Sequence, residues 1–288
     1  MYSEIEANKR KTWGLMVAFL AIVGIISWLV STYWFNSPST TVAILVMAAV
    51  YALISYFGAS KMAIAMNGAK EVTQKEQPRI YKTVENLAIT EEMPIPKVYI
   101  VEDKALNAFA TGRDPNHAVV AATTGLLDAM DDSELEGVMA HELGHIKNYD
   151  IRVSMVAFAL VAVIGLISDI FIRSLWFGRD NRNSGPAAAL SIVVIVLAPI
   201  VASLMKAAIS RKREYLADAT GALTTRYPDG LANALEKIKK YGAATKRQNS
   251  STAHLFFANP LRGNLASLFS THPPVDDRIA KLRGMTRG

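Results

Sequence analysis

The sequence contains no cysteine. This absence excludes disulfide bonds, catalysis by a thiol and metal ligation by thiolates. A zinc ion bound to this chain would therefore need nitrogen and oxygen ligands from other side chains. The absence is also in keeping with a reducing cytosolic environment, where structural disulfides are rare.

Charged residues are scarce as well, because they form 19% of the 288 residues while hydrophobic residues form 51%. This composition is too apolar for an ordinary soluble domain and too charged for a bundle that lies wholly in lipid. It predicts a protein that is partly membrane-embedded and partly soluble. The net charge of +6 is typical of basic residues that flank membrane segments, and no aromatic and basic repeat supports nucleic-acid binding. We therefore expect a lipid bilayer, and no nucleic acid, as a partner.

Charge is absent from the centres of four long apolar runs, over residues 13–35, 39–60, 153–168 and 186–205. The first two are long enough to cross a bilayer, and the short linker between them predicts a helical hairpin. A signal peptide is disfavoured, because the first run is too long and the second follows at once. For the third and fourth runs, spanning, partial insertion and burial in a soluble domain all stay open. The missing central charges weaken a transporter or proton-relay function.

Basic residues in the loops predict how the chain is oriented across the membrane, because they gather on the inner side. They precede the first run, follow the second run from Lys61 onward and follow the fourth run from Lys206 onward, whereas the first short loop has none. The loop between the third and fourth runs disagrees, because it carries Arg173, Arg179 and Arg182. The three other regions outweigh it, so we expect both termini and the central soluble segment on the inner side.

The expected parts are an N-terminal transmembrane hairpin over 1–60, a first soluble segment over 61–152, a second transmembrane hairpin over 153–205 and a second soluble segment over 206–288. The elements expected in the soluble segments are a helix over 78–89, strands over 97–102, 107–112 and 117–123, and helices over 210–223, over 231–240 and after Pro274. Another helix is expected to start at Ser133, which has Glu136 at the spacing of a capping box. The fold is thus mainly α with a small β-sheet.

The stretch HELGH at residues 141–145 is a candidate metal site on that helix. Residues four apart on a helix point the same way, so His141 and His145 present two imidazoles to one point. Two nitrogen donors suit zinc, which prefers four tetrahedral ligands. Glu142 lies beside them and could take a proton from water, whose pKa zinc lowers. A chance match would have to arise from only five histidines.

A third protein ligand is needed, since a catalytic zinc keeps its fourth position open. A zincin pattern with a third histidine shortly downstream is excluded, because Asn148 and Ile151 stand there. The remaining histidines are His117, His254 and His272. The better candidate is Glu214, because a membrane hairpin returns the chain to the same face. Helices that continue past the lipid would then hold His145 and Glu214 at similar heights.

Asp218 lies one turn beyond Glu214 on the same helix face. It could accept a hydrogen bond from the outer nitrogen of a ligating histidine and so orient the ring. The alternatives are that Glu214 is an exposed charge in a basic helix and that Asp218 has no part in the site.

Four stretches together, HELGH, EYLAD, NAFATG and THPPVDDR, resemble the HtpX family of membrane zinc metalloproteases, which is related to the CaaX-processing zinc proteases. The resemblance covers almost the whole chain. It implies a gluzincin-type α+β protease domain split by a membrane hairpin, with about four transmembrane helices in the bacterial cytoplasmic membrane. It also implies one zinc ion per chain, an active site on the cytoplasmic side, protein or peptide substrates and a role in stress-linked quality control of membrane proteins.

The resemblance further implies roles for individual residues. His141, His145 and Glu214 would bind zinc, and Glu142 would be the catalytic base. An edge strand would pair with an extended substrate through backbone hydrogen bonds, unless it is an ordinary sheet strand. This strand would comprise Asn107, Ala108, Phe109, Ala110 and Thr111. In THPPVDDR, His272 or Arg278 could stabilise the oxyanion, or the stretch could merely start a helix in which Arg278 pairs with a carboxylate.

Two functions from different classes remain. The first is a membrane-anchored zinc endopeptidase that needs Glu142 for cleavage. The second is a zinc-stabilised membrane adaptor that binds misfolded chains without cutting them and does not need Glu142. The sequence leaves the oligomeric state and the physiological substrates open.

Overall fold

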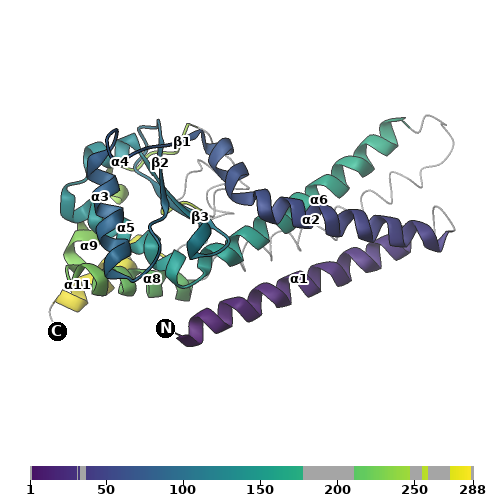
Figure 1. The fold of residues 1–288 in the computed structure, drawn as a ribbon, viewed down its shortest axis with the longest axis horizontal. Helices are drawn as coiled ribbons and strands as arrows, with labels where there is room; N and C mark the ends of the chain where they lie inside the picture. The colour runs from purple at the N-terminus through teal and green to yellow at the C-terminus, as the bar shows by residue number, and fades with distance from the viewer. Residues whose placement is uncertain are drawn as a thin grey trace.

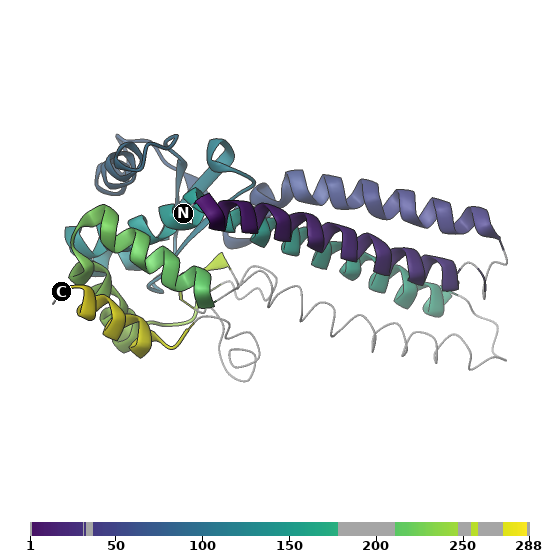
Figure 2. The same ribbon diagram turned by 90° about the horizontal axis from the view of Figure 1, so that it is seen from below.

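The computed structural model describes residues 2–30, 32, 37–177, 211–246, 255–258 and 273–286. Three long helices, α1 (Tyr2–Val30), α2 (Pro38–Asn67) and α6 (Asp150–Phe177), lie side by side (Figures 1 and 2). They extend from a unit that contains a small sheet and the shorter helices (Figure 1). This mainly helical architecture with a small sheet confirms the coarse fold class that the sequence predicts.

The outer surfaces of α1 and α2 carry most of the exposed large hydrophobic side chains. Trp13 on α1 is 63% exposed and Ile54 on α2 is 65% exposed. Lipid stabilises such outward-facing apolar groups, whereas water does not. Among the described residues, Thr41–Asn67 is the one helical stretch that is long and apolar enough to cross a membrane by length and composition. The apolar run over 153–168 forms part of α6, and the run over 186–205 lies outside the described residues.

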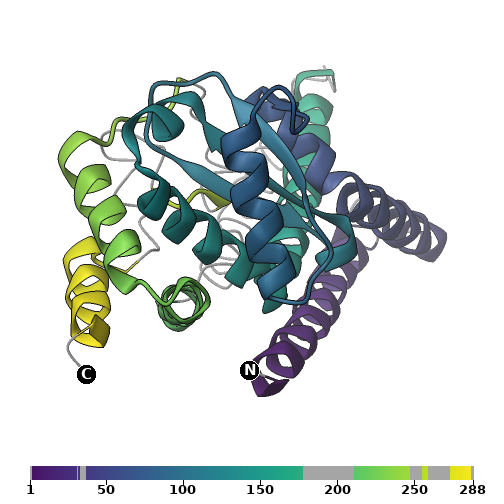
Figure 3. The same ribbon diagram turned by 60° about the vertical axis from the view of Figure 1, so that its left-hand side comes forward.

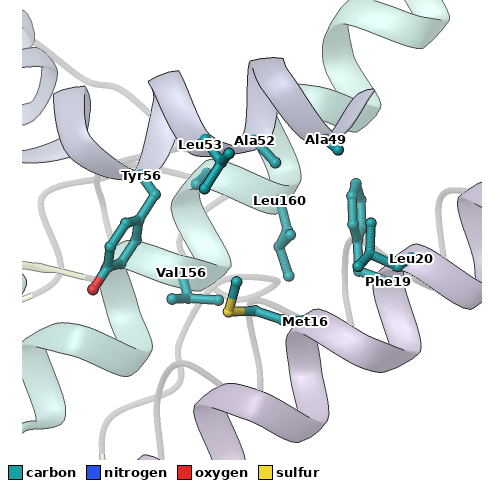
Figure 4. A pocket seen from close by; sticks show the side chains of 10 residues that line it. Met16, Phe19, Leu20, Ala49, Ala52, Leu53, Tyr56, Val156 and Leu160 are labelled. Carbon is teal, nitrogen blue, oxygen red and sulfur yellow. The ribbon is translucent and has the colours of Figure 1, made fainter. Parts of the chain in front are cut away.

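The inner faces of the three long helices form an apolar core of their own, which includes Phe19 of α1, Ala48 of α2 and Leu160 of α6. A cavity of about 240 Å³ remains between these helices, with Met16 and Tyr56 among its lining side chains (Figure 4). Side chains beside an unfilled space lose dispersion contacts. Among the described residues, the apolar side chains that line this cavity come from α1, α2 and α6.

Four strands form one mixed sheet in the order β1-β2-β4-β3. The strands are β1 (Ala69–Glu71), β2 (Lys97–Val101), β3 (Ala108–Gly112) and β4 (Ala118–Thr123). Strands β2 and β4 are parallel, and the other two pairs are antiparallel. The short 3₁₀ helix η2 (Pro115–His117) fills the predicted turn between β3 and β4. The three predicted strands are confirmed, β1 is additional, and β3 lies at an edge of the sheet.

Alternate residues of the strands serve two different cores, as the two-residue period of a strand requires. Ala108 and Ala110 of β3 face the core that the sheet shares with the soluble helices. Phe109 faces the opposite way and packs with Ala63 of α2 and Met155 of α6. The sheet therefore joins the long helices to the rest of the protein.

The shorter helices are α3 (Pro78–Thr90), α4 (Thr124–Ala129), α5 (Asp132–Lys147), α8 (Arg211–Thr225), α9 (Pro228–Tyr241) and α11 (Val275–Thr286). Helices α3 and α5 lie across one face of the sheet (Figure 3), whereas α8 and α9 pack on α5, and α11 packs on α9 and α8. The predicted helices over 78–89, 210–223, 231–240 and after Pro274 correspond to α3, α8, α9 and α11. Helix α4 has no counterpart among the predictions.

The N-cap of α5 differs from the prediction. Asp131, rather than Ser133, accepts a hydrogen bond from the backbone N–H of Glu134 at 2.9 Å, and the Glu134 carboxylate accepts one from the backbone N–H of Asp131 at 2.8 Å. The spacing is the same as for Ser133 and Glu136, and aspartate is also a favoured N-cap. Glu134 is buried beside Lys237, with 2.5 Å between the charged atoms, which favours the earlier start.

Candidate metal centre

The HELGH stretch lies in the second half of α5, a helix that packs against α8, α9 and β3. The rings of His141 and His145 lie edge to face at an interplanar angle of 88°, and their Nε2 atoms are 3.1 Å apart. His141 and Glu142 are 1% and 2% exposed, and His145 is partly exposed. Two imidazole nitrogens therefore meet at one nearly dry point, with the predicted base on the same turn.

Helix α8 brings Glu214 to this point. Its Oε1 lies 3.5 Å from Nε2 of His145, and its Oε2 lies 3.8 Å from Nε2 of His141. The two helices approach closely because residue 221 of α8 is glycine: a Cβ there would lie 3.1 Å from the backbone nitrogen of His141. The three donors, of which the described part of α8 supplies one and α5 two, all lie within 4.8 Å of one another.

The spacing of the donors fits a single small metal ion. Ligand bonds of 2.0–2.1 Å at a tetrahedral angle place neighbouring donor atoms about 3.3 Å apart. The separations of 3.1, 3.5 and 3.8 Å bracket this value. Two nitrogens and one carboxylate also form a donor set that zinc accepts at catalytic sites. The residues present therefore fit a metal centre with one position left for water.

A carboxylate stands behind each imidazole. Oδ1 of Asp218 lies 2.9 Å from Nδ1 of His141, which is the kind of contact expected from the sequence. Oδ2 of Asp150 lies 2.9 Å from Nδ1 of His145. Both contacts favour the tautomer with hydrogen on Nδ1, so that the lone pair of Nε2 points to the shared centre.

Asp150 is a site residue that sequence reasoning missed. Helix α5 ends at Lys147 and α6 begins at Asp150, so the two do not form the continuous helix on which the predicted height of His145 rests. Tyr149 adopts a φ of 60°, a left-handed conformation that is uncommon for a non-glycine residue. This break turns the chain and brings Asp150 back under His145.

Burial and the carboxylates act in opposite directions on the two imidazoles. Removal from water lowers the pKa of His141 to about 4, although the hydrogen bond and charge of Asp218 oppose the shift. Burial also lowers the pKa of His145, but the hydrogen bond to Asp150 and the neighbouring carboxylates outweigh it and raise this pKa to about 9. A metal that binds both rings therefore displaces a proton from His145.

Arg278 of α11 is 1% exposed and pairs with two acidic groups of α8. Its Nε and Nη2 donate to the two oxygens of Asp218 at 2.8 and 2.7 Å, and its Nη1 lies 3.9 Å from Oε2 of Glu214. This is the carboxylate pairing that the sequence left open as one of two roles. His272, the other candidate for the oxyanion, lies outside the described residues.

The predicted substrate strand is buried, and another part of the chain covers some of its free edge. The backbone N–H of Phe257 donates to the carbonyl of Ala108 at 2.8 Å, and Phe109 and Phe256 face each other in an antiparallel bridge. The carboxamide of Asn107 forms two hydrogen bonds with the backbone of residue 258. The Phe257 ring also lies 4.9 Å from that of His141. Residues 255–258 therefore lie between β3 and the metal centre.

Comparison with known proteins gives one consistent family. The sequence model of Peptidase family M48 matches residues 74–286. Proteins named Protease HtpX homolog are similar to the chain over nearly its whole length. That from Tropheryma whipplei (strain Twist) is 52% identical over 289 residues, covering 99% of this chain and 98% of the relative. The relatives from Dictyoglomus thermophilum and Streptococcus gordonii are each 42% identical, covering 99% of this chain and 94% and 100% of their own lengths.

A solved structure shares the fold. The crystal structure of S. mikatae Ste24p has a TM-score of 0.53 at 18% identity, and the match covers 98% of this chain and 67% of that protein. At this identity the likeness concerns the arrangement of the elements alone.

Proposed function

Because this chain belongs to the HtpX proteases of Peptidase family M48, it is a metalloprotease, and we propose that it is a membrane-anchored zinc endopeptidase. The observation that supports this most strongly is the convergence of two Nε2 atoms and the Glu214 carboxylate in a largely buried site. The outer nitrogen of each imidazole contacts a carboxylate, so that both rings are oriented before a metal binds.

His141, His145 and Glu214 would hold the zinc ion. When bound, zinc supplies Lewis-acid activation of a water molecule beside the scissile carbonyl. Glu142 takes a proton from the attacking water and later delivers it to the amine nitrogen that leaves. Because Glu142 is buried beside the donors, bulk water competes little with the attacking water for its carboxylate. Asp218 and Asp150 keep the two histidines in the tautomer that directs Nε2 inward.

Arg278 supports this centre through Asp218 and Glu214, because its charge compensates two buried carboxylates. For the oxyanion of the tetrahedral intermediate, we propose His272 or Arg278 as the donor. In Arg278, Nη1 lies nearest to Glu214 and is the nitrogen that such a role would use.

The substrate would pair with the edge of β3 over Asn107–Thr111, and residues 255–258 occupy part of this edge through the bridge of Phe256 and the backbone hydrogen bond of Phe257. An incoming peptide would take their place and form the same antiparallel backbone hydrogen bonds. The neighbouring apolar rings of Phe109 and Phe256, 5.0 Å apart, suggest that the edge accepts apolar, extended segments. Misfolded and membrane proteins expose such segments.

A crosslink tests whether residues 255–258 must leave. The cysteine-free chain allows Phe109→Cys and Phe256→Cys to be combined as the only possible disulfide pair. The oxidised double variant should not cleave an unfolded protein, and reduction should restore cleavage to the level of the two single variants. Equal rates in the oxidised and reduced double variant would contradict the shared edge.

For the membrane arrangement, we propose that α1, α2, α6 and the run over 186–205 all span the bilayer. The two soluble segments, 61–152 and 206–288, would then form one protease domain on the cytoplasmic side of the bacterial cell membrane. The exposed apolar side chains of α1 and α2 support this proposal. Quality control of membrane proteins under stress fits a protease anchored in this position.

The experiment that tests the proposed function uses the full chain purified in detergent with a chelator. Zinc is added back to the wild type and to Glu142→Gln, and both zinc content and cleavage of an unfolded protein are measured. We expect equal zinc binding and cleavage by the wild type alone. A Glu142→Gln protein that cleaves at the wild-type rate would overturn the role of Glu142. If the Glu142→Gln protein cleaves nothing and yet keeps the function of the wild type, the adaptor is favoured.

A further inference from the structure

The N-terminal end of α1 contacts the break between α5 and α6. Asn8 is 5% exposed, although it belongs to the first turns of a long helix at the end of the chain. Its Nδ2 donates to the carbonyl oxygen of Asn148 at 2.8 Å and to Oδ1 of Asp150 at 2.9 Å. One carboxamide therefore binds both ends of the break that places Asp150.

The two oxygens of Asp150 have different partners. Oδ1 faces Asn8, and Arg213 lies 3.6 Å from this same atom. Oδ2 faces Nδ1 of His145 at 2.9 Å. Rotation of the carboxylate about its bond to Cβ would break both sets of contacts at once. Because the group is 4% exposed, water cannot easily replace a lost partner.

We propose that Asn8 is a positioning residue for the metal centre: the first membrane helix reaches the site and fixes the Asp150 carboxylate against His145. This inference rests on the proposed zinc site. A carboxylate held in one orientation keeps the imidazole ring turned so that Nε2 faces Glu214, and outer partners of this kind commonly alter metal affinity 10–100-fold. Through Asn8, the membrane anchor is part of the metal site as well as a tether.

The test compares two buried asparagines in the full chain. Asn8→Ala removes the donor at the site, and Asn67→Ala is the matched control, because Asn67 is also buried in a long helix and donates to the carbonyl of Ala63 at 2.8 Å. Zinc affinity is measured by competition with a chelator, and the absorption spectrum of the Co²⁺-substituted protein reports the ligand geometry. The melting temperature of the metal-free form monitors general destabilisation.

We expect Asn8→Ala to weaken zinc binding about tenfold and to change the Co²⁺ spectrum. Asn67→Ala should leave the zinc affinity and the spectrum unchanged, even if both variants lower the melting temperature. A double-mutant cycle adds a second criterion. If Asn8 acts through Asp150, adding Asn8→Ala to Asp150→Asn should weaken zinc binding no further. Asn8→Gln keeps a carboxamide and should recover part of the lost zinc affinity. If Asn8→Ala fails to fold, Asn8→Ser is used in its place.

Wild-type zinc affinity and Co²⁺ spectrum in Asn8→Ala, or full additivity in the cycle, would overturn the proposal. Either result would leave the proposed function intact, because the wild type would still bind zinc and cleave. A wild-type protein that binds no zinc would instead contradict the proposed function itself.

Discussion

The two sides of the metal centre are built from different parts of the molecule. On one side, His141 contacts Asp218, which is held by Arg278 of α11, so all three belong to the shorter helices. On the other side, His145 contacts Asp150 at the start of α6, which is held by Asn8 of α1. The comparison teaches that a single candidate metal centre can join the helices around the sheet to the long helices α1 and α6.

The two sides also differ in charge. Asp218 accepts two hydrogen bonds from the buried Arg278, whereas Asp150 accepts one from the neutral carboxamide of Asn8 and has the Nε atom of buried Arg213 3.6 Å away. A buried carboxylate with a bidentate cation is strongly compensated, but the pair is costly to break. The side of His141 should therefore control stability, and the side of His145 should respond more to the position of the long helices α1 and α6.

The largest effect is expected where the two sides meet. Glu214→Ala removes the donor that both histidines share, so the variant should lose stoichiometric zinc and all detectable cleavage. Zinc content after dialysis against a weak chelator and the rate of cleavage measure the two effects. Wild-type zinc content together with the wild-type rate would show that another residue is the third ligand.

The second largest effect is expected from a substitution on the side of His141. Arg278→Met leaves Asp218 buried without its cation, so the free energy of unfolding should fall by about 3–5 kcal/mol. Arg283→Met on the same helix is the control, because Arg283 is partly exposed and a solvent-screened pair contributes about 1 kcal/mol or less. Denaturant unfolding of the chelated proteins measures both. Equal losses of unfolding free energy in the two variants would show that burial of the Arg278–Asp218 pair does not increase its contribution to stability.

The smallest effect compares the two carboxylates directly. Asp218→Asn and Asp150→Asn keep the size of each side chain and remove its charge, so each should weaken zinc binding about 10–100-fold. Chelator competition under identical conditions measures the two affinities. If one variant binds zinc as the wild type does, the centre depends on one side only, and the comparison between the sides fails.

The donors of the site could be predicted from the sequence because their signals are local. The four-residue spacing of His141 and His145 needs only a helix, and Asp218 follows Glu214 at the same spacing. The geometry of the structure brings all four together. Their roles in zinc binding stay predictions until the metal and the variants are measured.

The features that sequence reasoning missed depend on contacts distant in the chain. Asp150 reaches His145 only because Tyr149 is left-handed, and Asn8 lies 142 positions away from its partner. Residues 255–258 carry no strand pattern of their own and pair with β3 through tertiary contacts. The misplaced cap of α5 has another cause, since two capping pairs with equal spacing overlap and burial of Glu134 decides between them.

X-ray absorption at the zinc edge of the purified, active full chain tests the central claim most directly. The account predicts four nitrogen or oxygen donors at about 2.0–2.1 Å, two of them imidazoles, and loss of one oxygen donor or of the metal in Glu214→Ala. Three imidazoles in the zinc shell, or an unchanged shell in Glu214→Ala, would contradict it.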